Sequence, residues 1–229
     1  MQFRFADTAA PSRPLHVLRP DEVAAFSDNE GSLWAGWLTA TGFKAQPGEL
    51  CLLPGTDGGI AAAVAGIGTV DAGRRQRFIL AKVVDRLPAG AWRLSGALSP
   101  AERTECALGW LLSGYRFDRY RPDRKATERA ELVCPAGLDA VTLLAMAEGE
   151  ALTRDLINTP AQDMGPAELE AATRELGTRF DAAVSVTAGD ELLAANFPMI
   201  HAVGRASPRA PRLIDLQWGS TGPKLTLVG

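Results

Sequence analysis

The stretch that most constrains the fold covers residues 153–166, TRDLINTPAQDMGP. An apolar-periodic segment leads into it from Leu138, and Pro160 cannot continue a helix and disfavours helical geometry in the residue before it. A second helix is expected to begin at Pro166, because proline suits the first helical position and Glu168 follows in the first turn. The stretch therefore predicts a junction, with one folded unit before it and the beginning of another after it.

Length and composition indicate a soluble globular protein of one or two domains. The 229 residues are 46% hydrophobic and 22% charged. The formal net charge of −3 gives no electrostatic attraction to nucleic acid or to an anionic membrane. No apolar run reaches the roughly 20 residues that span a bilayer, and the N-terminus lacks a signal-peptide core. Cys51, Cys106 and Cys134 are scattered in apolar surroundings, so buried free thiols and a cytoplasmic location are expected.

Before the junction, strands and helices alternate, which predicts an α/β fold with a mixed sheet. Strands are expected at 15–18, 49–53, 60–65, 91–94 and 131–134, with a hairpin turn at Asp57-Gly58. Helices are expected after Pro20, around an inward face of Leu33, Trp34, Trp37 and Leu38, over 75–86, from Ser99 to Gly114, and from Leu138 to Ile157. Ser99, Pro100 and Glu102 form a capping-box pattern. The inward stripe of the last helix is expected to be Leu138, Val141, Ala145, Leu152 and Leu156.

After the junction the pattern changes to a helix followed by short strands. The helix from Pro166 is expected to turn Leu169, Ala172 and Leu176 inward and to end at Gly177, with a strand at 183–186 and a short helix capped by Asp190. Three more strands are expected at 199–203, 213–218 and 224–228. The predicted organisation is a domain over residues 1–136, a linker helix over 137–157, and the incomplete beginning of a second α/β domain over 158–229.

Single titratable residues give no catalytic set. His16 and His201 have no Cys or His partner at ligand spacing, so structural roles are expected for both. Asp155, Asp163, Glu168, Asp190 and Asp215 stand singly at helix ends or in loops, where solvation explains them. No Ser/His/Asp set, HExxH motif or P-loop is present. We therefore assign no catalytic, cofactor-binding or metal-binding residue to this chain.

Two motifs offer binding functions with simpler structural explanations. Gly66-Ile67-Gly68 follows a strand, but the third glycine of a dinucleotide fingerprint would fall at Asp71 and no helix start is evident there, so a turn is expected. The run from Tyr115 to Arg121, with Arg124 and Lys125, interleaves aromatic and cationic residues as nucleic-acid surfaces do. Asp118, Asp123 and the acidic net charge favour the alternative, in which the cations complement a helix C-terminus. No nucleic-acid or membrane partner is expected.

The junction and three later stretches carry a resemblance to a known family. RDLINTPAQDMGPAEL, NFPMIHAVGRAS, PRLIDLQW and KLTLVG resemble the beginning of the catalytic domain of the leucine (cytosol) aminopeptidases, bacterial members above all. The resemblance implies a macro-like N-terminal α/β domain without catalytic residues, peptide substrates, a hexamer, and two divalent ions, zinc or manganese. In that family the strand ending Val-Gly is followed by Lys-Gly and then Phe-Asp, where the metal site begins. By that comparison, all metal ligands and catalytic side chains lie beyond Gly229, and this chain alone is expected to be inactive.

A second hypothesis belongs to another class. The Ala- and Gly-rich strand and turn from Ala61 to Gly73 would suit a non-catalytic module that binds a nucleotide-like ligand or a protein partner. ADP-ribose or nucleotide binding in calorimetry would favour that module, and peptidase activity of a longer chain would favour the enzyme.

Overall fold

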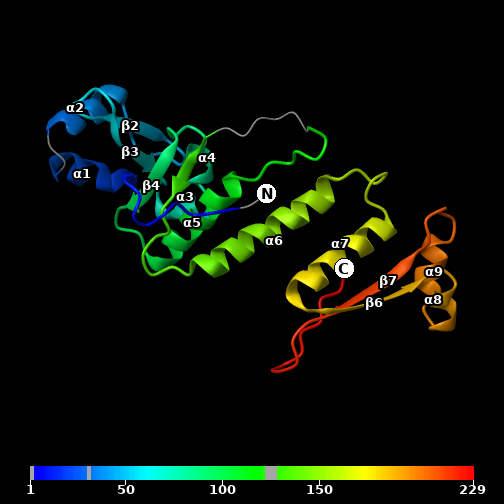
Figure 1. Cartoon of the computed structure of the whole chain (residues 1–229). Helices are drawn as coiled ribbons and strands as arrows, with labels where there is room; N and C mark the ends of the chain where they lie inside the picture. Colours follow the sequence, from blue (N-terminus) through cyan, green and yellow to red (C-terminus); the bar gives the residue numbers. More distant parts are fainter. Residues whose placement is uncertain (1–2, 30–31, 122–127) are drawn as a thin grey trace. The chain divides into compact units, whose positions relative to one another are not determined.

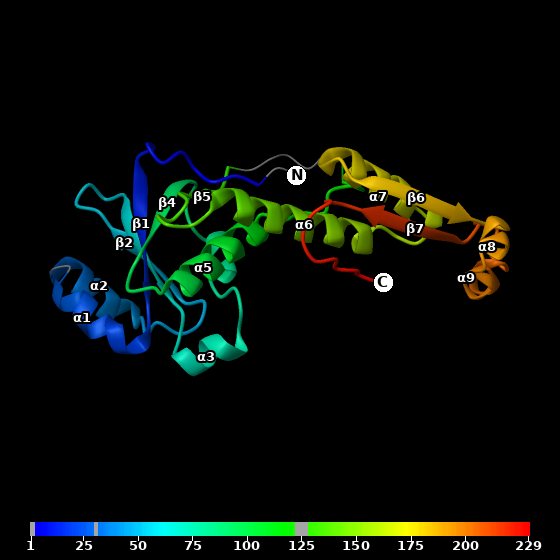
Figure 2. The ribbon, with the colours of Figure 1, turned by 90° about the horizontal axis from the view of Figure 1, so that it is seen from below.

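The structure is a computed structural model that describes residues 3–29, 32–121 and 128–229. It divides into two compact units, Met1–Thr153 and Arg154–Gly229. Figure 1 and Figure 2 show the elements of each unit, and the two units are described separately below.

The described part of the first unit is built on a five-stranded mixed sheet in the order β2-β3-β1-β4-β5. Strand β1 is parallel to β3 and to β4, β4 is parallel to β5, and only β2 and β3 are antiparallel. The strands are β1 (Ser12–Leu18), β2 (Leu50–Pro54), β3 (Ile60–Gly66), β4 (Gly90–Ser95) and β5 (Ala130–Leu132). The predicted α/β class and mixed sheet are confirmed.

Helices cover both faces of this sheet. Successive side chains of a strand point to opposite faces, and both faces carry apolar side chains that helices bury. On β3, Ala62 and Val64 join a core cluster beneath α1 and α2, whereas Ala63 and Ala65 join the larger cluster on the opposite face. Figure 1 and Figure 2 show α1 and α2 on one side and α5 on the other. The first layer contains η1 (Pro20–Glu22), α1 (Val23–Asn29) and α2 (Ser32–Thr41). The unit also contains α3 (Val70–Arg75), α4 (Ala81–Val84), α5 (Pro100–Ser113) and most of α6 (Ala140–Asn158).

Helix α2 also closes the free edge of the sheet. Trp37 Nε1 donates to the Leu52 carbonyl and Trp34 Nε1 to the Pro54 carbonyl, both at 3.0 Å. These carbonyls belong to β2, the edge strand. The expected inward face is therefore correct for the buried Leu38 and the partly buried Trp34, but Leu33 and Trp37 are exposed. Trp37 lies near the surface because its indole N–H donates to a carbonyl of the edge strand β2.

The helix expected over 75–86 is interrupted. Helix α3 ends at Arg75 and α4 begins at Ala81, and between them Phe78 has a positive φ of 56°. Its backbone N–H donates to Glu105 Oε1 of α5 at 3.0 Å, so this peptide is unavailable for a helical hydrogen bond. The sequence also provided no expectation of a helix start near Asp71. Helix α3 begins there at Val70, where the Thr69 side chain caps it by accepting from Ala72 N.

Helix α6 (Ala140–Asn158) begins close to the predicted position, but its buried stripe differs from the prediction. Leu143, Ala147 and Ala151 are buried in the core of the first unit. Val141, by contrast, is 77% exposed. Leu138 of the expected stripe does pack against this core, from the bend before α6, whereas Val141 and Ala145 of that stripe are exposed.

The second unit contains a two-stranded antiparallel sheet of β6 (Ala183–Ala188) and β7 (Arg212–Gln217), packed against α7 (Pro166–Phe180). Helix α7 begins as predicted, with Glu168 accepting from Gly165 N at 2.9 Å. It continues past Gly177, where a Cβ would lie 2.6 Å from Val184 Cγ2, so this glycine permits close helix–sheet packing instead of ending the helix. The helix ends before Asp181, which is left-handed. Helices α8 (Glu191–Ala194) and α9 (Pro198–Gly204) follow β6.

Two predicted strands are absent from this described unit. Residues 199–203 lie in α9, with Pro198 at its start, where proline's fixed φ favours a helix. Residues 224–228 form no strand, and Leu225, Leu227 and Val228 are exposed. A strand requires hydrogen-bonding partners, and no described segment pairs with this one.

Candidate functional site

The two histidines belong to different units. His16 of β1 lies among aromatic rings, with its centroid 4.8 Å from that of Phe26. In the second unit, His201 Nε2 lies 3.2 Å from Asp190 Oδ1. The contacts of both histidines fit the structural roles expected for them.

The single carboxylates mainly serve local structure. The pKa of Glu168 is lowered by hydrogen bonds from its own backbone N–H and from that of Gly165. Asp215 accepts from Gln217 Nε2 at 3.0 Å. Across residues 3–29, 32–121 and 128–229, no three His, Cys, Asp or Glu residues are grouped to hold a metal ion. The described residues therefore do not fit a dinuclear metal centre.

The junction loop is fastened within the second unit. Thr159 is buried, and its hydroxyl donates to the Asp155 carbonyl at 2.7 Å. Arg209 donates to the Ala161 carbonyl at 3.1 Å and also to the Gln162 carbonyl. The loop that begins the second unit is thus held by side-chain donors that bind its backbone carbonyls.

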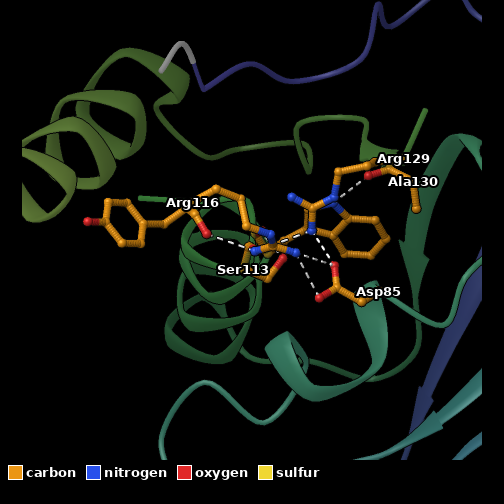
Figure 3. Close-up of polar contacts among 7 residues, drawn as sticks. Asp85, Ser113, Arg116, Arg129 and Ala130 are labelled. Atoms are coloured by element: carbon orange, nitrogen blue, oxygen red, sulfur yellow. Dashed lines mark hydrogen bonds and ion pairs between the residues drawn. The ribbon is translucent and has the colours of Figure 1, made fainter. Parts of the chain in front are cut away.

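The basic and aromatic run after α5 closes the end of that helix. Figure 3 shows the guanidinium groups of Arg116 and Arg129 converging on Asp85. Arg116 Nη1 donates to the Ser113 carbonyl at 2.7 Å and Arg129 Nη2 to the same carbonyl at 3.1 Å. Cations at a helix C-terminus complement its dipole, which is the structural role expected for this run. Asp123, Arg124 and Lys125 lie outside the described residues.

A pocket of about 340 Å³ lies beyond the carboxyl ends of three parallel strands. Arg19 follows β1, Ile67 follows β3, and α5 follows β4, so the sheet topology brings their side chains to one place. The lining is Arg19, Ile67, Val70, Arg77, Phe78, Ile79, Leu80, Glu102, Glu105 and Cys106. Sequence reasoning singled out the turn after β3 but took Glu102 only as a cap and missed both arginines.

Two arginine–glutamate pairs dominate the electrostatics of this pocket. Arg19 pairs with Glu102, and Arg77 Nε lies 2.9 Å from Glu105 Oε2. Glu102 also completes the predicted capping box, and its pKa is lowered mainly by the hydrogen bond from the Ser99 hydroxyl. Burial raises the pKa of the Cys106 thiol to about 12, with Glu105 and Glu102 adding to the shift. The thiol of Cys106 is therefore neutral at physiological pH and forms part of the pocket wall.

The second unit has a larger, mainly apolar pocket of about 700 Å³ between α7, α9 and β7. Met199 and Val203, one turn apart on α9, line it together with Leu169 of α7 and Ile214 of β7. Arg209 and Arg212 are its charged residues. Arg212 also pairs with Glu170.

Among the described helices, none has the length and apolar character that a membrane span requires.

Two protein-family descriptions match the chain in succession. Residues 13–135 match the M17 aminopeptidase N-terminal domain, and residues 151–229 match the catalytic domain of the cytosol aminopeptidase family. The chain belongs to the M17 aminopeptidase family. The resemblance seen in the junction and in the three later stretches is thereby confirmed.

Curated M17 relatives extend well beyond the matched region. A probable cytosol aminopeptidase of Aeropyrum pernix is 34% identical over an alignment of 188 positions, which covers 80% of this chain and 38% of that protein. One from Leifsonia xyli is 32% identical over an alignment of 231 positions, which covers 90% of this chain and 46% of that protein. The chain therefore spans less than half the length of these relatives.

Solved structures agree with the fold. The cytosol aminopeptidase of Coxiella burnetii has a TM-score of 0.83 at 30% identity, covering 93% of this chain and 46% of that protein. The bottromycin maturation enzyme BotP, solved in complex with Mn, has a TM-score of 0.67 at 26% identity, covering 90% of this chain and 45% of that protein.

Proposed function

We propose that the complete protein is a metal-dependent exopeptidase of the leucyl aminopeptidase type, which releases N-terminal amino acids from peptides. The observation that carries this proposal is the succession of the two M17 domain matches along one chain. The Mn complex of BotP supports a divalent metal, and we propose two ions, manganese or zinc, for the intact enzyme. A cytoplasmic location and a hexameric assembly are further parts of the proposal.

The proposal assigns this chain a structural share of the enzyme. Residues 1–136 are the non-catalytic, macro-like N-terminal domain, 137–157 the linker helix, and 158–229 the first part of the catalytic domain. We propose, from the family resemblance, that the ligands and catalytic side chains belong to the part of the M17 relatives that this chain does not cover.

Two assays test the proposal. The 229-residue chain is incubated with leucine p-nitroanilide and manganese or zinc, and no turnover above a metal-only blank is expected. A chain extended by its natural reading frame through a full catalytic domain is expected to gain metal-dependent turnover. Turnover by the short chain that survives repurification would contradict the structural share assigned to it. An extended frame without the Lys-Gly and Phe-Asp sequence expected after Gly229 would contradict the enzyme itself.

The nucleotide-binding alternative is less well supported by the pocket at the sheet edge. The N-terminus of α5 is already satisfied, since the Ser99 backbone N–H donates to Glu102 Oε2 at 2.9 Å. Glu102 and Glu105 both line the pocket, and carboxylates repel phosphate groups. Saturable ADP-ribose binding in calorimetry would restore this alternative.

A further inference from the structure

The pocket beside α5 carries charges of both signs at close range. Glu102 and Glu105 are three residues apart on α5, so they lie on the same side of the helix, and each is paired with an arginine. The four groups have no net charge. A purely anionic ligand would meet two carboxylates there and a purely cationic ligand would meet two guanidinium groups. A zwitterion complements both.

Arg77 and Glu105 each retain bonding capacity for such a ligand. The ion pair brings Arg77 Nε to 2.9 Å from Glu105 Oε2, and guanidinium has five N–H donors, so the terminal N–H groups of Arg77 suit a ligand carboxylate. Glu105 Oε1 accepts from Phe78 N–H at 3.0 Å, and Glu105 Oε2 is the oxygen that faces Arg77. Each carboxylate oxygen has a second lone-pair position, which suits a ligand ammonium group.

The walls of the pocket select an apolar side chain. Ile67, Ile79 and Leu80 are buried and line it. The volume of about 340 Å³ is at the small end of the roughly 300–1,000 Å³ typical of ligand pockets. This size suits one small molecule better than a dinucleotide.

Phe78 forms part of this wall in a strained conformation. Its φ of 56° is unusual for a large side chain. Glu105 holds its backbone N–H, the Arg77 guanidinium carbon lies 5.3 Å from the ring centroid, and Gly109 leaves room for it on α5. Strained residues held by several contacts are concentrated at ligand-binding sites. The same two residues that carry the opposite charges thus also shape the apolar wall.

We infer that this pocket binds a free α-amino acid with an apolar side chain, its carboxylate on Arg77 and its ammonium group on Glu105. The inference goes beyond the proposed peptidase activity and does not depend on it, because binding is measured on the 229-residue chain without turnover. The ligand is of the class that the proposed reaction would release, so the pocket would let the N-terminal unit sense product.

The test is a titration of the isotopically labelled chain with L-leucine, followed by backbone amide NMR. Saturable shifts are expected in residues 67–80 and 99–106. L-leucinamide, which lacks the carboxylate, and 4-methylpentanoate, which lacks the amine, are each expected to bind about tenfold or more weakly, because each loses charge-assisted hydrogen bonds. Absence of saturation, equal binding by either analogue, or shifts confined to other regions would overturn the inference.

A matched pair of variants locates the binding. Glu105→Gln keeps an oxygen for the Phe78 N–H, and Arg77→Met keeps the aliphatic stem, so each removes charge with little loss of packing. Both are expected to weaken L-leucine binding by about tenfold or more. The control variants are Arg4→Met and Glu131→Gln, because Arg4 and Glu131 form an ion pair and do not line the pocket. The side-chain exposures of this pair are 73% and 34%, close to the 69% and 31% of Arg77 and Glu105. Arg77→Met leaves the hydrogen bond from Phe78 N–H to Glu105 in place. Unchanged binding in this variant would therefore overturn the inference even if Glu105→Gln were unstable.

Discussion

Leu143 and Val141 of α6 provide a direct test of which face of that helix is buried. Leu143 is 3% exposed in the core of the first unit, whereas Val141 is 77% exposed. Truncating each side chain to alanine changes one contact surface and leaves the other intact. The hydrophobic pattern of the sequence places Val141 inside, so the two substitutions distinguish the sequence-based stripe from the observed one.

The expected magnitudes differ several-fold. Leu→Ala at a buried site costs about 2–5 kcal/mol of unfolding free energy, through lost transfer energy and the residual cavity. At the exposed Val141 the change is expected to lie within about 0.5 kcal/mol, because little burial is lost and alanine is the better helix former. With a urea m-value of about 2 kcal/mol/M, Leu143→Ala should lower the midpoint by about 1–2.5 M.

Urea unfolding followed by tryptophan fluorescence measures both variants. Trp34, Trp37, Trp92 and Trp110 lie in the first unit, and only Trp218 of the chain's five tryptophans lies in the second. The signal therefore reports mainly the unit that contains the Leu143 contacts. Equal costs for the two substitutions, or a loss below about 1 kcal/mol for Leu143→Ala, would refute the assignment of the buried stripe.

Three other predictions concern single groups. Ser99→Ala should cost about 1 kcal/mol through loss of the α5 cap. Because Ser99 lowers the pKa of Glu102 below its ordinary 4.5, the stabilisation is present above that pH and is lost as pH falls through the folded-state pKa, so urea midpoints of the two proteins should converge in acid. Cys106, with a pKa of about 12, should resist alkylation at neutral pH until the chain is unfolded, and rapid labelling of the native protein, read by peptide mass spectrometry, would contradict its burial. Gly66→Ala should cost about 3 kcal/mol or more in a thermal melt, because a Cβ would overlap the backbone of Ala45 and Gln46. Gly36→Ala in α2, which meets nothing within 4 Å, is the control and should be neutral or stabilising.

Local signals in the sequence predicted the parts of the fold that local chemistry controls. The Ser99 capping box, the start of α7 at Pro166 and the Asp57-Gly58 hairpin turn lie where expected. Each depends on residues within a few positions of one another, so the sequence contains the whole cause. The mixed sheet was also predictable, because its strands are short apolar runs between turn residues.

The errors arose where a distant residue decides the local structure. Phe78 leaves the helical region because Glu105, 27 positions away, takes its N–H. The same long-range contact builds the pocket wall, so the pocket was not predictable from spacing. Residues 199–203 form a short and mainly apolar run, yet they belong to the helix that begins at Pro198. Short apolar runs do not distinguish strands from helices by periodicity alone.

The two indole hydrogen bonds on β2 have a consequence for the newly made chain. An uncovered strand edge can pair with another nascent chain, and N-terminal regions fold first during synthesis. Helix α2 precedes β2 in the sequence, so Trp34 and Trp37 leave the ribosome before the carbonyls of Leu52 and Pro54 that they cover. The first sheet of this protein can therefore form with its outer edge already protected, while the remainder of the polypeptide is still being translated.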